Sequence, residues 1–286
     1  MRAFSCFTLA ILSLVAGCTE NPFGGDDTIE SGNSSIRGSI VLSDRGPAEG
    51  IHVWLDGFDI KSRTDAKGEF TVTIPPPSGQ DTPGGATGVF TLYGFLANYS
   101  LFTATVATRN GYFLYGTKDI STDGSLAFPG FMIERFSMNI DVSPNVLYAS
   151  VLADSGGVVD VTVTLTGKQT GVRVYFPTLV DNTQGPLFFH NLTTGEVFIL
   201  ESAVAQNTGG ETMTLGVTPA TRIMKAAIGK HILTPGTYEI RPYLRALRPD
   251  VPRELIRSLG ARATSLHADY MNYPLKFTGG RLTVQP

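Results

Sequence analysis

Short alternating segments separated by glycine and proline turns most strongly constrain how this chain can fold. Apolar and polar residues alternate in 51–55 and 70–74, and 36–43 has a similar strand-like pattern. A period of two places every second side chain on one face of a strand, so each segment predicts a strand with a buried face. Short strands between turn signals predict an all-β fold.

The same pattern continues through the second half of the chain. We place a boundary at the Ser143-Pro144-Asn145 turn signal, with one sandwich over 36–143, ending in a strand or bridge at 136–142, and a second over 144–286. The strand spacing in the second half predicts an immunoglobulin-like sandwich. The strands expected there are 158–165, 172–176, 187–190, 196–200, 212–217 and 237–244.

One short helix is expected near the C-terminus. Asp250 suits the N-cap, Pro252 the first turn and Gly260 the C-terminal cap, which predicts a helix over 251–259. Arginines in and around this helix are interpreted as a solvated face in preference to an anion or lipid-headgroup site. They are Arg245, Arg248, Arg253, Arg257 and Arg262.

Length and charge exclude several classes of protein. A chain of 286 residues has room for two modest domains, and 42% hydrophobic residues exclude a disordered protein. Charged residues make up 16% of the chain and the formal net charge is −3, so the sequence has no basic footprint for nucleic-acid binding.

The N-terminus has the features of an export signal. Arg2 precedes an almost wholly apolar segment, 4–16, which is shorter than the ~20 residues of a membrane span. The segment ends in Leu14-Val15-Ala16-Gly17-Cys18, which resembles the lipobox of bacterial lipoproteins. The resemblance implies a signal peptide over 1–17, cleavage before Cys18, and a lipid anchor on Cys18 that comprises diacylglycerol and a palmitate-type acyl chain.

Cysteine use favours this anchor over an ordinary secretory signal. Cys6 leaves with the signal peptide, so Cys18 is the only cysteine of the mature chain and no disulfide can form within it. Thr19 differs from the Asp that resembles an inner-membrane retention signal, so we expect a cell-envelope protein in the outer membrane if the organism has two membranes. The segment 18–35 predicts a flexible tether.

The first sandwich contains a recognisable succession of residues. A glycine-containing strand, a proline turn, a glycine before an alternating strand and Thr64-Asp65-x-x-Gly68-x-Phe70 follow one another. This succession resembles the carboxypeptidase regulatory-like domain, which implies a transthyretin-like β-sandwich. The matching residues are Ile36, Gly38, Val41, Pro47, Gly50, Ile51, Val53, Leu55, Thr64, Asp65, Gly68, Phe70 and Val72.

The family resemblance implies no peptidase activity, because no histidine has a glutamate three residues later to form the zinc ligand pair. The motif that begins at Thr64 is interpreted as structural. Asp65 can accept hydrogen bonds from backbone N–H groups, Gly68 can adopt a positive φ and Phe70 can enter the core. The pattern departs from the family at Ala97-Asn98, where glycine is expected.

Aromatic residues gather between 90 and 115. Aromatic rings beside a sandwich can stack on sugars, but several of these follow a strand period, and we prefer core and cross-strand packing for them. Trp54 is out of phase with its apolar neighbours and must face the opposite side of its strand. The candidate ligand surface comprises Trp54, Tyr93, Tyr99, Tyr112 and Tyr115.

Local sequence motifs for catalysis, nucleotide binding or metal binding are absent, so we expect no cofactor and no metal. The favoured hypothesis is a non-enzymatic envelope lipoprotein whose sandwiches bind a protein or a glycan. Two alternatives stay open. One is an enzyme with a site assembled from distant residues such as His190, and the other is a proteinase-inhibitor-like module that presents a loop such as 206–211.

Overall fold

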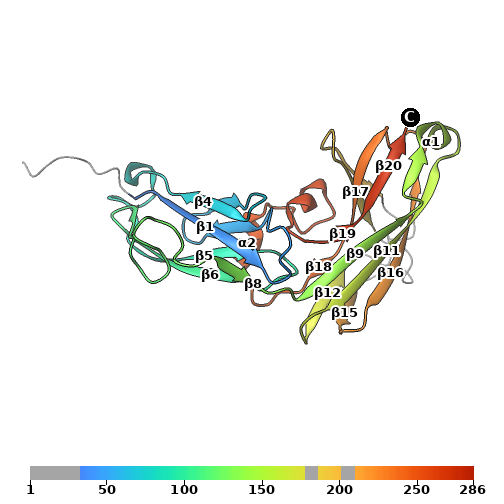
Figure 1. Ribbon diagram of the computed structural model, residues 1–286. Coiled ribbons are helices and arrows are strands. Elements are labelled where there is room, and N and C mark those ends of the chain that lie inside the picture. The colour runs from blue at the N-terminus through green and yellow to red at the C-terminus, as the bar shows by residue number, and fades with distance from the viewer. Residues whose placement is uncertain (1–32, 178–185, 201–209) are drawn as a thin grey trace, which may run out of the picture. The chain divides into compact units, whose positions relative to one another are not determined.

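The structure is a computed structural model that describes residues 33–177, 186–200 and 210–286. Strands dominate the described residues and form two β-sandwiches (Figure 1). The expected all-β class is therefore confirmed. The signal peptide, Cys18 and most of the tether lie outside the described residues, as do residues 206–209 of the loop considered for proteinase inhibition.

Two sheets form the first sandwich, in the orders β4-β1-β8 and β3-β2-β5-β6-β7. β1 pairs antiparallel with β4 and parallel with β8, and the short 3-10 helix η1 (Pro77–Gly79) follows β4. The strands are β1 (Ser35–Leu42), β2 (His52–Leu55), β3 (Ile60–Arg63), β4 (Glu69–Thr73), β5 (Gly88–Phe95), β6 (Phe102–Arg109), β7 (Tyr112–Phe113) and β8 (Gly130–Met132).

Alternation along the strands decides which side chains enter the core of this sandwich. In β4, Phe70 and Val72 are buried, whereas Glu69, Thr71 and Thr73 are exposed. Burial of a large apolar side chain contributes roughly 1.5–3 kcal/mol relative to exposure, so the pattern strongly favours one face as the inner face.

Three sheets form the second sandwich, in the orders β16-β11-β9-β19, β10-β20-β17-β13-β14 and β15-β12-β18. Side chains from all three contribute to one large apolar cluster. The strands are β9 (Phe136–Ser143), β10 (Val146–Tyr148), β11 (Gly157–Gly167), β12 (Val172–Phe176), β13 (Leu187–Asn191), β14 (Val197–Leu200), β15 (Glu211–Leu215), β16 (Ala220–Ile228), β17 (Gly236–Pro242), β18 (Arg245–Ala246), β19 (Thr278–Gly279) and β20 (Arg281–Gln285).

β9 lies in the second sandwich, although its sequence pattern predicted the last strand of the first sandwich or a bridge. It pairs antiparallel with β11 along its whole length, from Phe136↔Gly167 to Ser143↔Asp160, and parallel with β19. The turn signal at Ser143-Pro144 therefore separates two strands of one sandwich. A turn residue marks the end of a strand, but it carries no information about the partner of that strand.

The helices differ from the prediction in two ways. A helix that was not predicted, α1 (Ala149–Ser155), precedes β11, and the C-terminal helix α2 is shorter than expected (Arg253–Ser258). Pro252, rather than Asp250, occupies the N-cap of α2, and the Asp250 carboxylate binds Arg248. No helix of the described part is long and apolar enough to cross a membrane.

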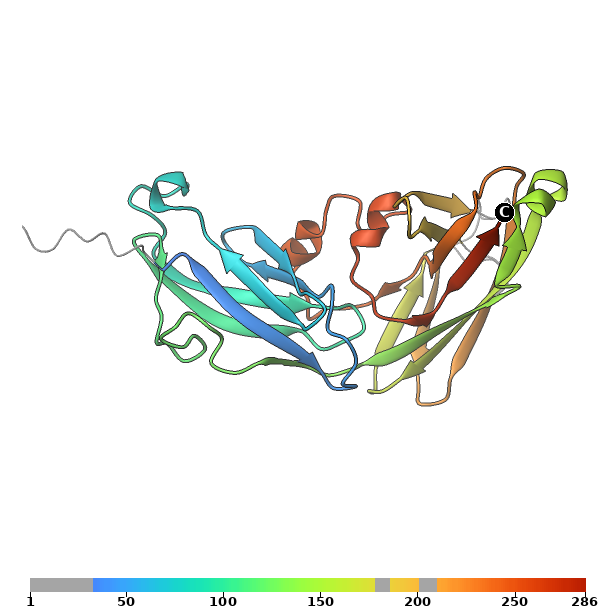
Figure 2. The same cartoon turned by 45° about the horizontal axis from the view of Figure 1, so that its top comes forward.

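Residues 247–277, which we call the return segment, run from the end of β18 to the start of β19 and contact the first sandwich. They contain α2 and the 3-10 helix η3 (Ala268–Asn272), which lie in the orange-red part of the ribbon in Figure 2. Ser258 of α2 is hydrogen-bonded to His52 of β2, and Trp54 and Phe95 belong to the apolar cluster of the second sandwich. The return segment therefore completes the outer face of the β2 and β5 strands.

Candidate binding groove

The connection between β5 and β6 is the first of three polar contacts between the two sandwiches. Its Asn98 side chain is almost fully buried, donates to the carbonyl oxygens of Phe136 and Lys276, each at 3.1 Å, and accepts from the Lys276 N–H at 3.1 Å. Ala97 N–H donates to the Pro274 carbonyl at 2.8 Å. Asn98 stands where the family resemblance leads one to expect glycine, and its side-chain amide serves to join the two sandwiches.

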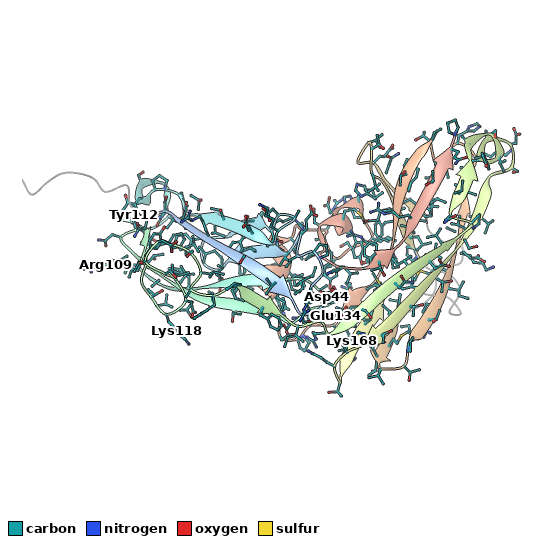
Figure 3. The ribbon with its side chains drawn as sticks, in the orientation of Figure 1. Asp44, Arg109, Tyr112, Lys118, Glu134 and Lys168 are labelled. Carbon is teal, nitrogen blue, oxygen red and sulfur yellow. The ribbon has the colours of Figure 1, made fainter. Side chains whose placement is uncertain are left out.

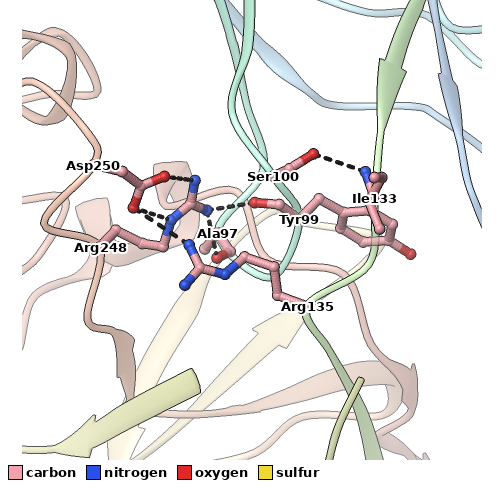
Figure 4. A network of polar contacts seen from close by, with 7 residues as sticks. All are labelled: Ala97, Tyr99, Ser100, Ile133, Arg135, Arg248 and Asp250. Carbon is pink, nitrogen blue, oxygen red and sulfur yellow. Dashed lines mark hydrogen bonds and ion pairs between the residues drawn. The ribbon is translucent and has the colours of Figure 1, made fainter. Parts of the chain in front are cut away.

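Arg248 of the return segment forms the second contact (Figure 4). Its guanidinium donates to the carbonyl oxygens of Ala97, at 3.1 Å, and of Tyr99, and to both carboxylate oxygens of Asp250 at 2.9 and 2.7 Å. Arg135 approaches the same carboxylate at 3.3 Å. The Arg248 side chain is only 3% exposed, which corrects its interpretation as part of a solvated face. Hydrogen bonds from Arg248 lower the pKa of Asp250 to about 2.

Asp44 is the centre of the third contact. It accepts hydrogen bonds from Tyr99 Oη at 3.0 Å and Lys276 Nζ at 2.9 Å. Burial opposes ionisation of Asp44, but the hydrogen bonds from Lys276, Gly46 and Tyr99 outweigh it and lower its pKa. Glu134 and Lys168 lie beside Asp44 in Figure 3, and burial, together with the charge of Asp44, raises the pKa of Glu134.

A groove of about 670 Å³ lies beside Lys276 and is lined by both sandwiches and the return segment. Its floor combines apolar side chains with charged ones. The lining residues are Pro47, Glu49, Gly50, Arg63, Leu96, Glu239, Arg241, Met271, Tyr273, Pro274, Leu275, Lys276, Phe277, Thr278, Gly279 and Arg281. Grooves of this size that mix apolar area with a few fixed polar groups are typical of ligand sites.

Two arginines of the groove are held in place in different ways. Arg241 pairs with Glu239 at 2.9 Å and lies over the Phe277 ring at 5.3 Å. Arg63 donates to the carbonyl oxygens of Gly50 at 3.0 Å and Asn272 at 2.8 Å. In the part of the chain that the structure describes, no carboxylate lies within 4.0 Å of Arg63. Burial and the charge of Arg241 lower its pKa.

His52 and Ser258 form a buried pair that superficially resembles a base and a nucleophile. His52 Nε2 lies 2.8 Å from Ser258 Oγ. The Ser258 oxygen is also 2.7 Å from the Leu255 carbonyl, to which its hydroxyl can donate. Both residues are buried, with His52 3% and Ser258 6% exposed. The pair therefore serves as a link between β2 and the return segment.

The five aromatic residues of the candidate ligand surface do not share one face. Trp54 and Tyr93 stack with ring centroids 5.7 Å apart, and Trp54 is only 3% exposed because the return segment covers it. Tyr99 is fully buried in the first core, Tyr115 packs against that core, and Tyr112 lies at the end of the first sandwich away from Asp44 (Figure 3). Trp54 faces the side that its alternation predicted, but Trp54 and Tyr99 are inaccessible to a ligand.

The Thr64 motif has a structural geometry. Asp65 Oδ1 accepts from the N–H groups of Lys67 and Glu69, both at 2.9 Å, and Phe70 enters the core. Thr64 Oγ1 accepts from the Ile51 N–H at 2.9 Å and donates to the Ala48 carbonyl. Thr64, Asp65 and Gly68 lie at the turn before β4, Phe70 lies in β4, and none of the four lines the groove.

Four residues of these contacts and pockets have no sequence motif that marks them as site residues: Lys61, Arg63, Asn98 and Ser258. Lys61 and Arg63 alternate with Ile60 and Ser62 in the short strand β3, which was the one available signal. The described residues contain no group of three or more His, Cys, Asp or Glu side chains that could hold a metal ion.

Comparison with known proteins leaves the family open. A scan against protein-family models finds no match, and a search of curated proteins finds none either. The structure is similar to the crystal structure of BcpA, the major pilin subunit of Bacillus cereus, at 13% identity and a TM-score of 0.24, covering 73% of this chain and 63% of that one. It is also similar to the Bacillus anthracis TIE protein at 12% identity and a TM-score of 0.22, covering 75% of this chain and 28% of that one.

A third similar structure is CBD12 from CALX1.2, at 11% identity and a TM-score of 0.20, with 82% of this chain and 86% of that one covered. The chain thus spans less than two thirds of the length of the first two proteins. Likenesses at these TM-scores carry no argument about what this protein binds.

Proposed function

We propose that this protein is a non-enzymatic, lipid-anchored cell-envelope protein that binds an envelope protein or a glycan in the groove between its two sandwiches. The observation that carries the proposal is the groove itself, because both sandwiches and the return segment supply its walls. Polar contacts at Asn98, Arg248 and Asp44 hold those walls together. A site whose walls are fixed before binding loses less entropy when a ligand binds.

The anchor is proposed from the sequence. The lipobox-like Leu14–Cys18 segment supports lipid attachment at Cys18, and Thr19 supports location in the outer membrane of a two-membrane cell. The carboxypeptidase regulatory-like succession supports a transthyretin-like identity for the first sandwich. Several acyl chains bind a membrane far more strongly than one, so the anchor is expected to be stable.

The anchor can be tested separately from the groove. Globomycin should block processing of the wild-type chain, and Cys18→Ala should release the protein from the membrane fraction. Unchanged fractionation of the Cys18→Ala variant would exclude a lipid anchor at this position.

The binding function is tested by capture from envelope extract. The tagged full chain is extracted in detergent, incubated with extract, and analysed by mass spectrometry, with a glycan array run in parallel. Arg281→Glu reverses a half-exposed charge at the edge of the groove, and Lys225→Glu makes the same change on β16, away from it. We expect Arg281→Glu to lose the captured partner or glycan and Lys225→Glu to retain it. Equal capture by both variants would show that the partner or glycan does not bind in the groove.

A further inference from the structure

A second pocket adjoins the groove, and Arg63 lines both. This pocket, which is open to solvent, has a volume of about 470 Å³ between β2 and β3 on one side and the return segment on the other. Lys61 and Arg63 are exposed. Its lining contains two cationic side chains and no carboxylate. The lining residues are His52, Lys61, Ser62, Arg63, Ser258, Leu259, Gly260 and Asn272.

Neutral carbonyl groups hold both cations. Lys61 Nζ donates to the Ser258 carbonyl at 3.2 Å, and Arg63 donates to the Gly50 and Asn272 carbonyls. Among the described residues neither cation has a carboxylate within 4.0 Å, whereas Arg241, Arg248 and Lys276 all do. Carbonyl oxygens orient these side chains without neutralising them. Arg63 uses only two of the five N–H donors of a guanidinium in this way, and Lys61 only one of three.

Carboxylates flank this pocket without lining it, and two of them, Asp65 and Glu69, line another pocket with Arg63. Arg241 lies close enough to lower the pKa of Arg63, and burial with the charges of Arg63 and Lys61 lowers the pKa of His52 to about 4. His52 is therefore neutral at pH 7. Asp59, whose charge acts on His52, accepts from Trp54 Nε1 at 3.2 Å. It lies with Asp56, Asp81 and Glu254 in a different pocket on the other side of Lys61.

We propose that the pocket binds a phosphate group carried by a ligand, with Lys61 and Arg63 as its charge partners. A phosphate monoester carries about −1.5 to −2 charges at pH 7, which matches two unpaired cations, whereas a carboxylate would leave one of them unmatched. A guanidinium fork suits two phosphate oxygens at once, and lysine supplies a point charge. Ser62 and Asn272 add polar groups to the lining. This inference rests on the proposed function and deepens it, because the rest of the ligand would extend past Arg63 into the groove.

Phosphorus NMR tests the site on the full, lipid-anchored protein in detergent. Inorganic phosphate is titrated at constant ionic strength, with chloride replacing phosphate in the reference. We expect saturable broadening of the phosphate line by the wild type. Arg63→Met and Lys61→Met should each weaken binding at least about tenfold, since a hydrogen bond to a charged group contributes roughly 1.5–3 kcal/mol.

Two further variants distinguish a loss of phosphate binding from a loss of folding. Arg257→Met removes a 76% exposed arginine of α2 outside the pocket and should bind phosphate like the wild type. Arg63→Lys keeps the charge and should bind more tightly than Arg63→Met. Wild-type affinity in Arg63→Met, or no broadening by the wild type beyond the chloride reference, overturns the proposal whatever the other variants do.

Two competitors identify the carrier of the phosphate. Displacement of inorganic phosphate by glucose 6-phosphate supports a phosphorylated sugar, and displacement by dihexanoyl phosphatidic acid supports a lipid headgroup. If neither displaces it, the pocket does not accept a ligand-borne phosphate and the inference fails. Partner capture that persists without phosphate binding overturns this inference alone, and phosphate binding without partner capture overturns the proposed function alone.

Discussion

Gly68 lies where backbone conformation and space both demand glycine. Its φ is +81°, and a Cβ atom would lie 2.4 Å from the Ile40 carbonyl oxygen of the adjacent strand. Gly50 has a φ of +77° with open space around it, so it isolates the conformational effect. Gly50→Ala should lower the free energy of unfolding by about 1–2 kcal/mol, and Gly68→Ala by more, because β1 must move. Urea denaturation checks this, and equal losses would contradict it.

His52 should make stability depend on pH. Burial, with the charges of Arg63 and Lys61, lowers its pKa from 6.5 to about 4. Below pH 6.5 the unfolded chain gains a proton that the native chain does not, so the free energy of unfolding falls until about pH 4. The full shift corresponds to roughly 3 kcal/mol. Urea denaturation at pH 7 and pH 4.5 should show a smaller difference for His52→Gln than for the wild type. An equal difference would assign the pH dependence to other groups.

At the scale of the elements, the short connection between β5 and β6 should contribute strongly to stability. Asn98→Ala would remove the hydrogen bonds of the buried Phe136 carbonyl and of the part-buried Lys276 carbonyl and N–H. Each buried group left unpaired costs about 1–3 kcal/mol. Asn139→Ala is the matched control, because Asn139 is exposed and makes one side-chain hydrogen bond, to Thr278. Thermal unfolding should show a much larger loss for Asn98→Ala; similar losses would contradict the joining role.

Alternation predicted most strands correctly because it is a local signal. β4, β11 and β12 lie within a residue or two of the segments expected from the sequence. The pairing of β9 with β11 and the position of the return segment depend on residues far apart in the chain. Local sequence patterns contain no information about such long-range contacts. The candidate site was the part least predictable from the sequence. The role of Arg63 depends on hydrogen bonds to the carbonyl groups of Gly50 and Asn272, and no spacing along the chain predicts these bonds.

At the scale of the whole molecule, loss of the Arg248 side chain should lower the stability of both sandwiches. Breaking a buried ion pair costs about 3–5 kcal/mol, and because Asp250 is 43% exposed we expect the lower end of that range for Arg248→Met. Calorimetry should show a lower Tm and a broadened or divided transition. Arg257→Met removes an exposed arginine and should leave the transition unchanged. A single sharp transition in Arg248→Met would mean that the apolar contacts suffice to couple the sandwiches.

The position of the return segment also has a consequence for the order in which the parts of the molecule fold. The hydrogen bond between His52 and Ser258 joins residues 206 positions apart, and Trp54 and Phe95 have no cover until the return segment is in place. Closing so long a loop is entropically costly and slows folding. We therefore expect an incomplete chain to expose the apolar face around Trp54 and Phe95, which is buried in the complete protein. That face offers chaperones and proteases a simple means of telling unfinished molecules from finished ones.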